Sequence, residues 1–121
     1  MDLNLKKEIF MVCKDVRDYF ESNPRILYGY HPSSFPKGWC GSACEHLRKR
    51  LKQELNIDCI SRSGNMYDSD ASTRNNHAWL EHEGFYIDIT ADQFNFDGYD
   101  NPPIMVTSDS SFHSQFSFDL K

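Results

Sequence analysis

The stretch "NHAWLEHEGFYIDITADQF", residues 76–94, decides the fold. Runs rich in β-forming residues lie on both sides of Glu83-Gly84, and a pair of this kind is typical of a two-residue hairpin turn. The stretch therefore predicts two antiparallel strands, 77–82 and 85–90. A hairpin of this length needs further elements to pack against, so the rest of the chain has to supply them.

Asp88 stands out in the second strand, because aspartate is depleted in strand interiors and this one lies between Ile87 and Ile89. With a two-residue turn, Trp79 faces Asp88, and His77 then lies diagonally from Asp88 on the same face. A three-residue loop would put them on opposite faces. A histidine partner is one reason for the aspartate; a buried hydrogen bond to backbone, or exposure on the outer face, is the alternative.

The remaining elements follow from spacing and from turn residues. Apolar positions three and four apart predict an amphipathic helix over 2–21, ended by Asn23-Pro24, and a second helix that begins at about 38–41. Proline, glycine and serine predict a loop between the two helices. The sequence also predicts a short strand at 57–61, a mobile polar loop at 62–76 and a short strand at 104–107.

The predicted elements make an α+β fold, with N-terminal helices packed on a small antiparallel sheet, and the length favours one domain, 1–121. The chain has 121 residues, of which 39% are hydrophobic and 14% aromatic. That length is enough for a single core and too short for two. We therefore expect one functional site.

Charge and hydropathy exclude two classes of partner. The formal net charge is −5, whereas nucleic-acid binding needs a broad positive surface, so nucleic acid is not expected. Apolar runs are far shorter than a bilayer span, and the N-terminus lacks the apolar segment of a signal peptide. We expect a cytoplasmic protein that does not enter a membrane, although some bacterial proteins leave the cell without a cleaved signal. The sequence leaves the oligomeric state open.

Cys40 is the candidate nucleophile because it falls in the first turn of the second predicted helix. Free N–H groups and the helix dipole lower the pKa of a thiol there, and the same N–H groups can bind an oxyanion. His77 is the candidate base, since histidine titrates near neutrality and pairs with thiols. Asp88 would then orient the imidazole of His77.

The other cysteines and histidines have ordinary structural explanations. A cysteine is more often a small buried hydrophobe than a nucleophile, and this reading fits Cys13, Cys44 on its leucine stripe and Cys59 in an apolar strand. The remaining histidines are expected at the surface or in loops: His31, His46, His82 and His113. Cys40 and Cys44 are spaced as a zinc pair, but no second matching pair follows, so no metal is expected.

Two motifs in this order, "GWCGSACEHL" and "NHAWLEHEGFYIDIT", resemble the transglutaminase-like branch of the papain-like cysteine hydrolases. In that family a cysteine opens a helix, a histidine starts a strand in an H-A-W pattern, and an aspartate follows in a D-x-T pattern. The resemblance covers residues 38–94. It implies a transglutaminase-like core in which Cys40 is the nucleophile, His77 the base and Asp88 the orienting acid.

The implied activity is hydrolysis or acyl transfer on an amide or thioester, with a protein or peptide as substrate and no cofactor. Protease, deamidase, amidase and transferase share this chemistry, and the order of residues does not separate them. The glutamine that papain-type proteases place before the nucleophile is missing, so the second oxyanion donor is open. Candidates are Gln93 and the backbone N–H of Trp39 or Cys40, while Trp79 is a candidate wall of the cleft. Gln93 is equally well explained as a structural residue that ties the strand end to a loop. The alternative is an inactive binding or adaptor module on the same fold.

Overall fold

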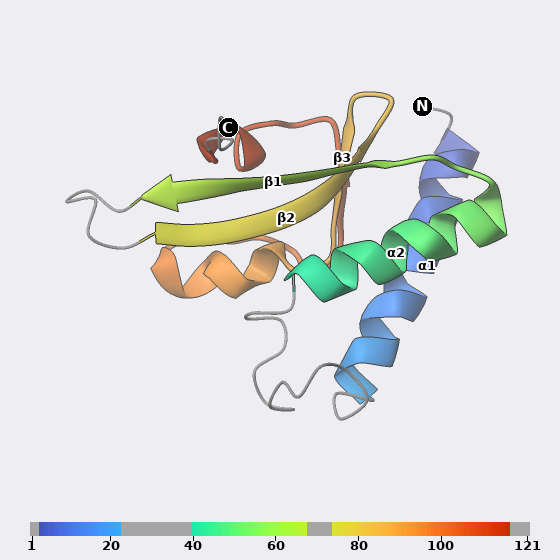
Figure 1. Cartoon of the computed structure of the whole chain (residues 1–121), viewed down its shortest axis with the longest axis horizontal. Coiled ribbons are helices and arrows are strands. Elements are labelled where there is room, and N and C mark those ends of the chain that lie inside the picture. Colours follow the sequence, from blue (N-terminus) through green and yellow to red (C-terminus); the bar gives the residue numbers. More distant parts are fainter. Residues whose placement is uncertain (1–2, 23–39, 68–73, 117–121) are drawn as a thin grey trace.

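The computed structural model describes residues 3–22, 40–67 and 74–116, which form helices and an antiparallel sheet (Figure 1). The α+β class expected from the sequence is confirmed. Short 3-10 helices follow β3 and β4. The elements in chain order are α1 (Leu3–Ser22), α2 (Cys40–Leu55), β1 (Ile60–Tyr67), β2 (Arg74–His82), β3 (Phe85–Asp88), η3 (Ala91–Asp97), β4 (Met105–Thr107) and η4 (His113–Gln115).

Both predicted helices are confirmed, and each buries one stripe of side chains. The apolar residues buried from α1 are Ile9, Val12, Cys13, Val16 and Phe20, and those from α2 are Ala43, Cys44, Leu47 and Leu51. These positions repeat at three, four and seven residues, so each stripe faces a single direction. The helices pack against one another and α2 packs on β2. The second helix begins at Cys40, within the predicted start.

The hairpin has the predicted register. Glu83 and Gly84 both have positive φ, 49° and 82°, as a two-residue type I′ turn requires. The turn joins facing pairs such as Glu81↔Tyr86, which is the register derived from the sequence. The sheet has the order β1-β2-β3-β4, and all neighbouring strands are antiparallel.

The sheet separates two cores. A row of facing residues, Leu80, Ile87 and Val106, packs with α1 and α2 on one face. On the other face lies an aromatic cluster that the segments after β3 close. Its buried members, which define the aromatic cluster from here on, are Trp79, Ala91, Phe94, Phe112 and Phe116. Alternation along the strands therefore divides residues between a helix-covered face and an aromatic face.

The expected strand at 57–61 and loop at 62–76 are wrong in part. β1 covers Ile60–Tyr67 and β2 begins at Arg74, and the two strands pair along this length. Polar residues of the expected loop therefore belong to strands. The reason is that β1 is an edge strand held by backbone hydrogen bonds to β2, and exposed side chains there need not be β-formers. Cys59, expected inside a strand, precedes β1 and is half-buried.

The second hairpin strand is shorter than expected. It was predicted over 85–90, but β3 ends at Asp88, and residues 89–90 lead out of the sheet toward η3. Pairing between β2 and β3 therefore ends at Leu80↔Ile87. The earlier residues of β2 pair with β1 alone, and His77 lies opposite Gly64 there. The expected strand at 104–107 is confirmed as β4.

Replacing Gly84 by alanine should destabilise the protein by about 1 kcal/mol, because only the left-handed φ opposes the new Cβ. No atom lies within 4 Å of that Cβ position. Gly41→Ala is the matched control: it also meets open space, lies in α2 and should stabilise by roughly 0.5 kcal/mol. Urea unfolding of both variants measures the difference. Equal effects in the two variants would contradict a turn that depends on positive φ.

Candidate functional site

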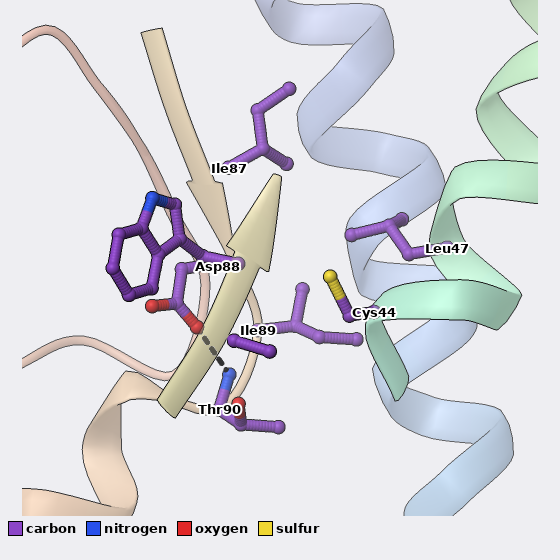
Figure 2. Close-up of a pocket in the computed structure, with 8 residues that line it drawn as sticks. Cys44, Leu47, Ile87, Asp88, Ile89 and Thr90 are labelled. Atoms are coloured by element: carbon purple, nitrogen blue, oxygen red, sulfur yellow. Dashed lines mark hydrogen bonds between the residues drawn. The ribbon is translucent and has the colours of Figure 1, made fainter. Parts of the chain in front are cut away.

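Asp88 lies at the end of β3, with its side chain directed away from the two helices (Figure 2). Cys44 and Leu47 of α2 lie on the opposite side of the strand in the same view. The carboxylate is 2% exposed, and its Oδ1 accepts the backbone N–H of Thr90 at 3.0 Å. A buried carboxylate needs several donors to offset the hydration it has lost.

His77 is one of those donors. Its Nε2 lies 2.6 Å from Oδ2 of Asp88, and its side chain is buried. The prediction that these two side chains lie on the same face of the hairpin is confirmed. The contact follows from the type I′ turn, because a shift of one residue in register would carry His77 to the helix-covered face.

His113 is the second donor, and the sequence reasoning missed it. Its Nε2 lies 2.7 Å from the same Oδ2 of Asp88, and the residue is 2% exposed, so the expectation of a surface histidine is wrong. The physical reason is that η4 lies in the aromatic cluster. The ring stacks parallel on Tyr86 at 4.9 Å and lies 4.9 Å from Trp79. A histidine flanked by Phe112 and Phe116 was the available signal for burial.

The remaining histidines behave differently from His113. His46 is half-buried and stacks on Tyr19 at 5.2 Å, and His82 is half-buried beside the backbone oxygen of Asp58. His31 lies outside the described residues. Of the histidines that the structure describes, only His77 and His113 hydrogen-bond to Asp88.

The environment keeps Asp88 ionised. Burial raises its pKa, but attraction to His77 and hydrogen bonds from both histidines outweigh burial, so the pKa lies well below its usual range. An ionised carboxylate is only an acceptor, so both Nε2 atoms carry the proton. Nδ1 of His113 is buried and has no hydrogen-bond partner among the described residues.

Gln93 occupies the other side of the His77 ring. Its Nε2 lies 3.2 Å from Nδ1 of His77, and the residue is half-buried at the start of η3. A side-chain amide offers a donor at one end and an acceptor at the other, so rotation by 180° lets it meet either protonation state of the imidazole. Nδ1 of His77 therefore faces the Gln93 amide, whereas Nε2 faces Asp88.

Trp79, a sequence candidate for substrate binding, lies in the aromatic cluster and is 2% exposed. Its indole N–H donates to Glu81 at 2.9 Å. Its role toward a substrate stays a prediction. Trp39 lies outside the described residues, as does the side chain of Cys40. For Cys40 the structure gives the backbone position at the start of α2.

The start of α2 lies near the end of β3. Cys44 lines a small cavity together with Asp88 and Thr90 (Figure 2), and the cavity volume of about 10 Å³ is room for one water at most. Position 40 is four residues earlier, hence on the same helix face one turn nearer the N-terminus. The N-terminus of α2 is therefore close to the point where β3 gives way to η3.

Arg17 holds that junction from the helix-covered side. Its guanidinium makes a two-point contact with Asp92 at 2.7 and 2.8 Å, and it donates to the carbonyls of Ile89 and Pro103 at 2.8 and 3.0 Å. Burial lowers its pKa, but hydrogen bonds to Asp92 and Glu21 outweigh burial and the pKa is raised. α1 thereby fixes the segment that carries the chain from Asp88 to Gln93.

The described cysteines, Cys13, Cys44 and Cys59, are free thiols, and the first two are buried as expected. Burial raises the pKa of Cys13, and burial raises that of Cys59 to about 11. Such thiols are poor nucleophiles near neutral pH, because the reactive form is the thiolate.

The same three side chains could supply metal ligands. One donor atom from each of His77, Asp88 and His113 lies within 4.8 Å of the others, and zinc prefers such nitrogen and oxygen donors. Both nitrogens, however, lie at hydrogen-bond distance from one oxygen, 2.6 and 2.7 Å. Ligands around a tetrahedral zinc ion lie about 3.3 Å apart, given bonds of about 2.0 Å, so the side chains would have to separate to admit an ion.

Comparisons with protein-family models, with curated proteins and with solved structures find no match. Among the described residues, no helix is long and apolar enough to cross a membrane.

Asp88→Asn should destabilise the protein at pH 7 by about 3 kcal/mol, because it removes the charge that two buried imidazoles face. The pKa of Asp88 is lowered on folding, so its contribution is complete above the unfolded value of about 3.9 and is lost as pH falls through the lowered pKa. The difference in the free energy of unfolding between wild type and variant should therefore become smaller below about pH 4.

Urea unfolding between pH 7 and pH 3 measures this gap. Asp58→Asn is the control, since the Asp58 side chain is 85% exposed and pairs only with the exposed Lys52 in the described structure. A gap for Asp88→Asn that stayed constant over this range would contradict a carboxylate ionised by its histidine partners.

Proposed function

We propose that this protein is a thiol-dependent hydrolase or acyltransferase that acts on an amide or thioester. Cys40 would be the nucleophile, His77 the base and Asp88 the group that orients the imidazole. The observation that carries the proposal is the buried 2.6 Å contact between His77 and Asp88, in a chain whose second helix begins at Cys40. A histidine fixed by a carboxylate is what a cysteine nucleophile needs from its surroundings.

In the proposed reaction the thiol proton of Cys40 passes to Nδ1 of His77. The sulfur forms a bond to the carbonyl carbon, and the imidazolium returns its proton to the departing amine or thiol as the bond to that group breaks. Water or an amine then attacks the acyl-enzyme and releases the thiol. Asp88 stays ionised throughout and keeps the Nε2 proton in place.

Two groups are candidates to stabilise the oxyanion. The first turn of α2 has backbone N–H groups without intrahelical partners, which favour negative charge at that end of the helix. Gln93 provides a side-chain amide 3.2 Å from His77, within reach of a reacting carbonyl beside that ring.

A protein or peptide substrate suits the surface next to the site. A cavity of about 290 Å³ reaches His113, with Trp79 and Tyr86 as aromatic walls and Arg62 and Glu81 as charged groups. That volume is near the lower end for ligand sites and fits one side chain better than a large cofactor. Aromatic walls with a few polar groups are typical of such sites.

The second candidate function is an inactive binding or adaptor module. One observation favours it: His77 is 1% exposed, so its ring is enclosed in this structure. A base has to reach the proton it abstracts, although catalytic contacts often form only when substrate binds. The two candidates differ in one property, which is whether Cys40 is activated.

Iodoacetamide at mildly acidic pH should label Cys40 faster than Cys13, Cys44 and Cys59, because only Cys40 has a helix start and a histidine to stabilise the thiolate. His77→Ala should slow labelling of Cys40 about tenfold or more. Peptide mass mapping after short exposure gives the four rates.

His82→Ala is the matched control, since His82 is a half-buried histidine at the other end of β2. It should leave the labelling of Cys40 unchanged. Slow labelling of Cys40 that equals the rate of the buried thiols would support the adaptor module and contradict the enzyme.

A further inference from the structure

We infer that His113 is a positioning residue of this site, which acts on His77 through the carboxylate they share. The inference rests on the proposed function, and it adds a fourth side chain to the Cys40, His77 and Asp88 arrangement. His113 does not touch the reacting atoms in this scheme. Its role is to hold Asp88 in the orientation that His77 requires.

The geometry of Asp88 supports this role. Three donors fix the carboxylate: Thr90 N–H on Oδ1 at 3.0 Å, and His77 and His113 on Oδ2 at 2.6 and 2.7 Å. An oxygen with two lone pairs is satisfied by two donors. Without His113, each oxygen of the carboxylate would accept one hydrogen bond. The carboxylate could then rotate away from His77 about the Cβ–Cγ bond.

His113 is itself held firmly, which a positioning residue has to be. Its ring lies parallel to Tyr86 at 4.9 Å and near Trp79, and Phe112 packs edge-on against it at 5.0 Å. Its side chain is fully enclosed. The aromatic cluster therefore fixes the plane of the ring, and the ring fixes the carboxylate oxygen.

The burial pattern also argues against a purely structural histidine. Nδ1 of His113 has no hydrogen-bond partner, although it is buried. A phenylalanine would fill the same place between Tyr86 and Trp79 without that cost. The hydrogen bond from Nε2 to Asp88 offsets that cost. This bond therefore explains why the residue is a histidine.

Two variants separate the bond from the packing. His113→Phe keeps an aromatic ring on Tyr86 and removes the donor, whereas His113→Gln keeps an N–H donor near the position of Nε2. His113→Phe should lower the rate of Cys40 labelling by iodoacetamide about tenfold, the size expected from losing one hydrogen bond to a charged group. His113→Gln should keep the rate near that of wild type.

Nuclear magnetic resonance of the imidazole groups gives a readout that does not depend on Cys40. In the wild type, His77 and His113 should each show a downfield, slowly exchanging Nε2 proton. In His113→Phe the His77 proton should move upfield and exchange faster, and in His113→Gln it should stay close to its wild-type position. Val16→Ala, a core variant on the helix-covered face, controls for general loss of stability.

The outcomes are distinct. A His77 signal and a Cys40 rate that are the same in His113→Phe and in wild type would overturn the inference and leave the proposed function standing. Wild-type Cys40 that labels no faster than the other thiols would contradict the proposed function, and the His77 signal alone would then decide the positioning role. If His113→Phe and Val16→Ala lowered the Cys40 labelling rate and changed the His77 signal equally, the inference would also be overturned, because both changes would then reflect stability only.

Discussion

The ionised carboxylate of Asp88 is fully enclosed, and the arrangement around it follows from the need to offset its lost hydration. Its donors come from three separate parts of the chain: β2 through His77, η4 through His113, and the bend after β3 through Thr90. Removing any one of them would leave a buried charge with fewer partners, which is costly in a low-dielectric interior. The carboxylate therefore ties the hairpin to the C-terminal aromatic cluster.

That constraint also divides the two nitrogens of His77 between different neighbours. Nε2 faces Asp88 and Nδ1 faces Gln93, so in the proposed mechanism Nδ1 is the nitrogen that would take the proton of Cys40. Arg17 fixes the path between Asp88 and Gln93 by binding Ile89 and Asp92. A side chain from the helix-covered face thereby anchors the segment that carries Gln93, the neighbour of His77.

The sequence predicts the part of the site that depends on local rules. A two-residue turn fixes the hairpin register, and register alone brings His77 to Asp88. His113 follows from no local rule, because a single 3-10 turn has no periodicity to read and its burial arises from packing between segments distant in the chain. Residues 60–61 are the part of β1 that falls within the strand predicted at 57–61. The rest of β1 was missed for a related reason, since pairing with β2 decides its structure while the polar stretch at 62–65 carries no strand signal.

Two buried polar clusters in this fold differ in a way that bears on function. Arg17 is a permanent cation whose bidentate partner and carbonyl acceptors account for its burial, so its cluster is explained by the tie between α1 and the β3 to η3 segment. The cluster around Asp88 consists of groups that can gain or lose protons, and it leaves one nitrogen of His113 unpaired. Well-packed apolar residues of similar volume would often be as stable as such a cluster. Stability alone therefore gives little reason for two histidines on one aspartate, whereas the proposed proton transfer at a fixed imidazole would give a direct one.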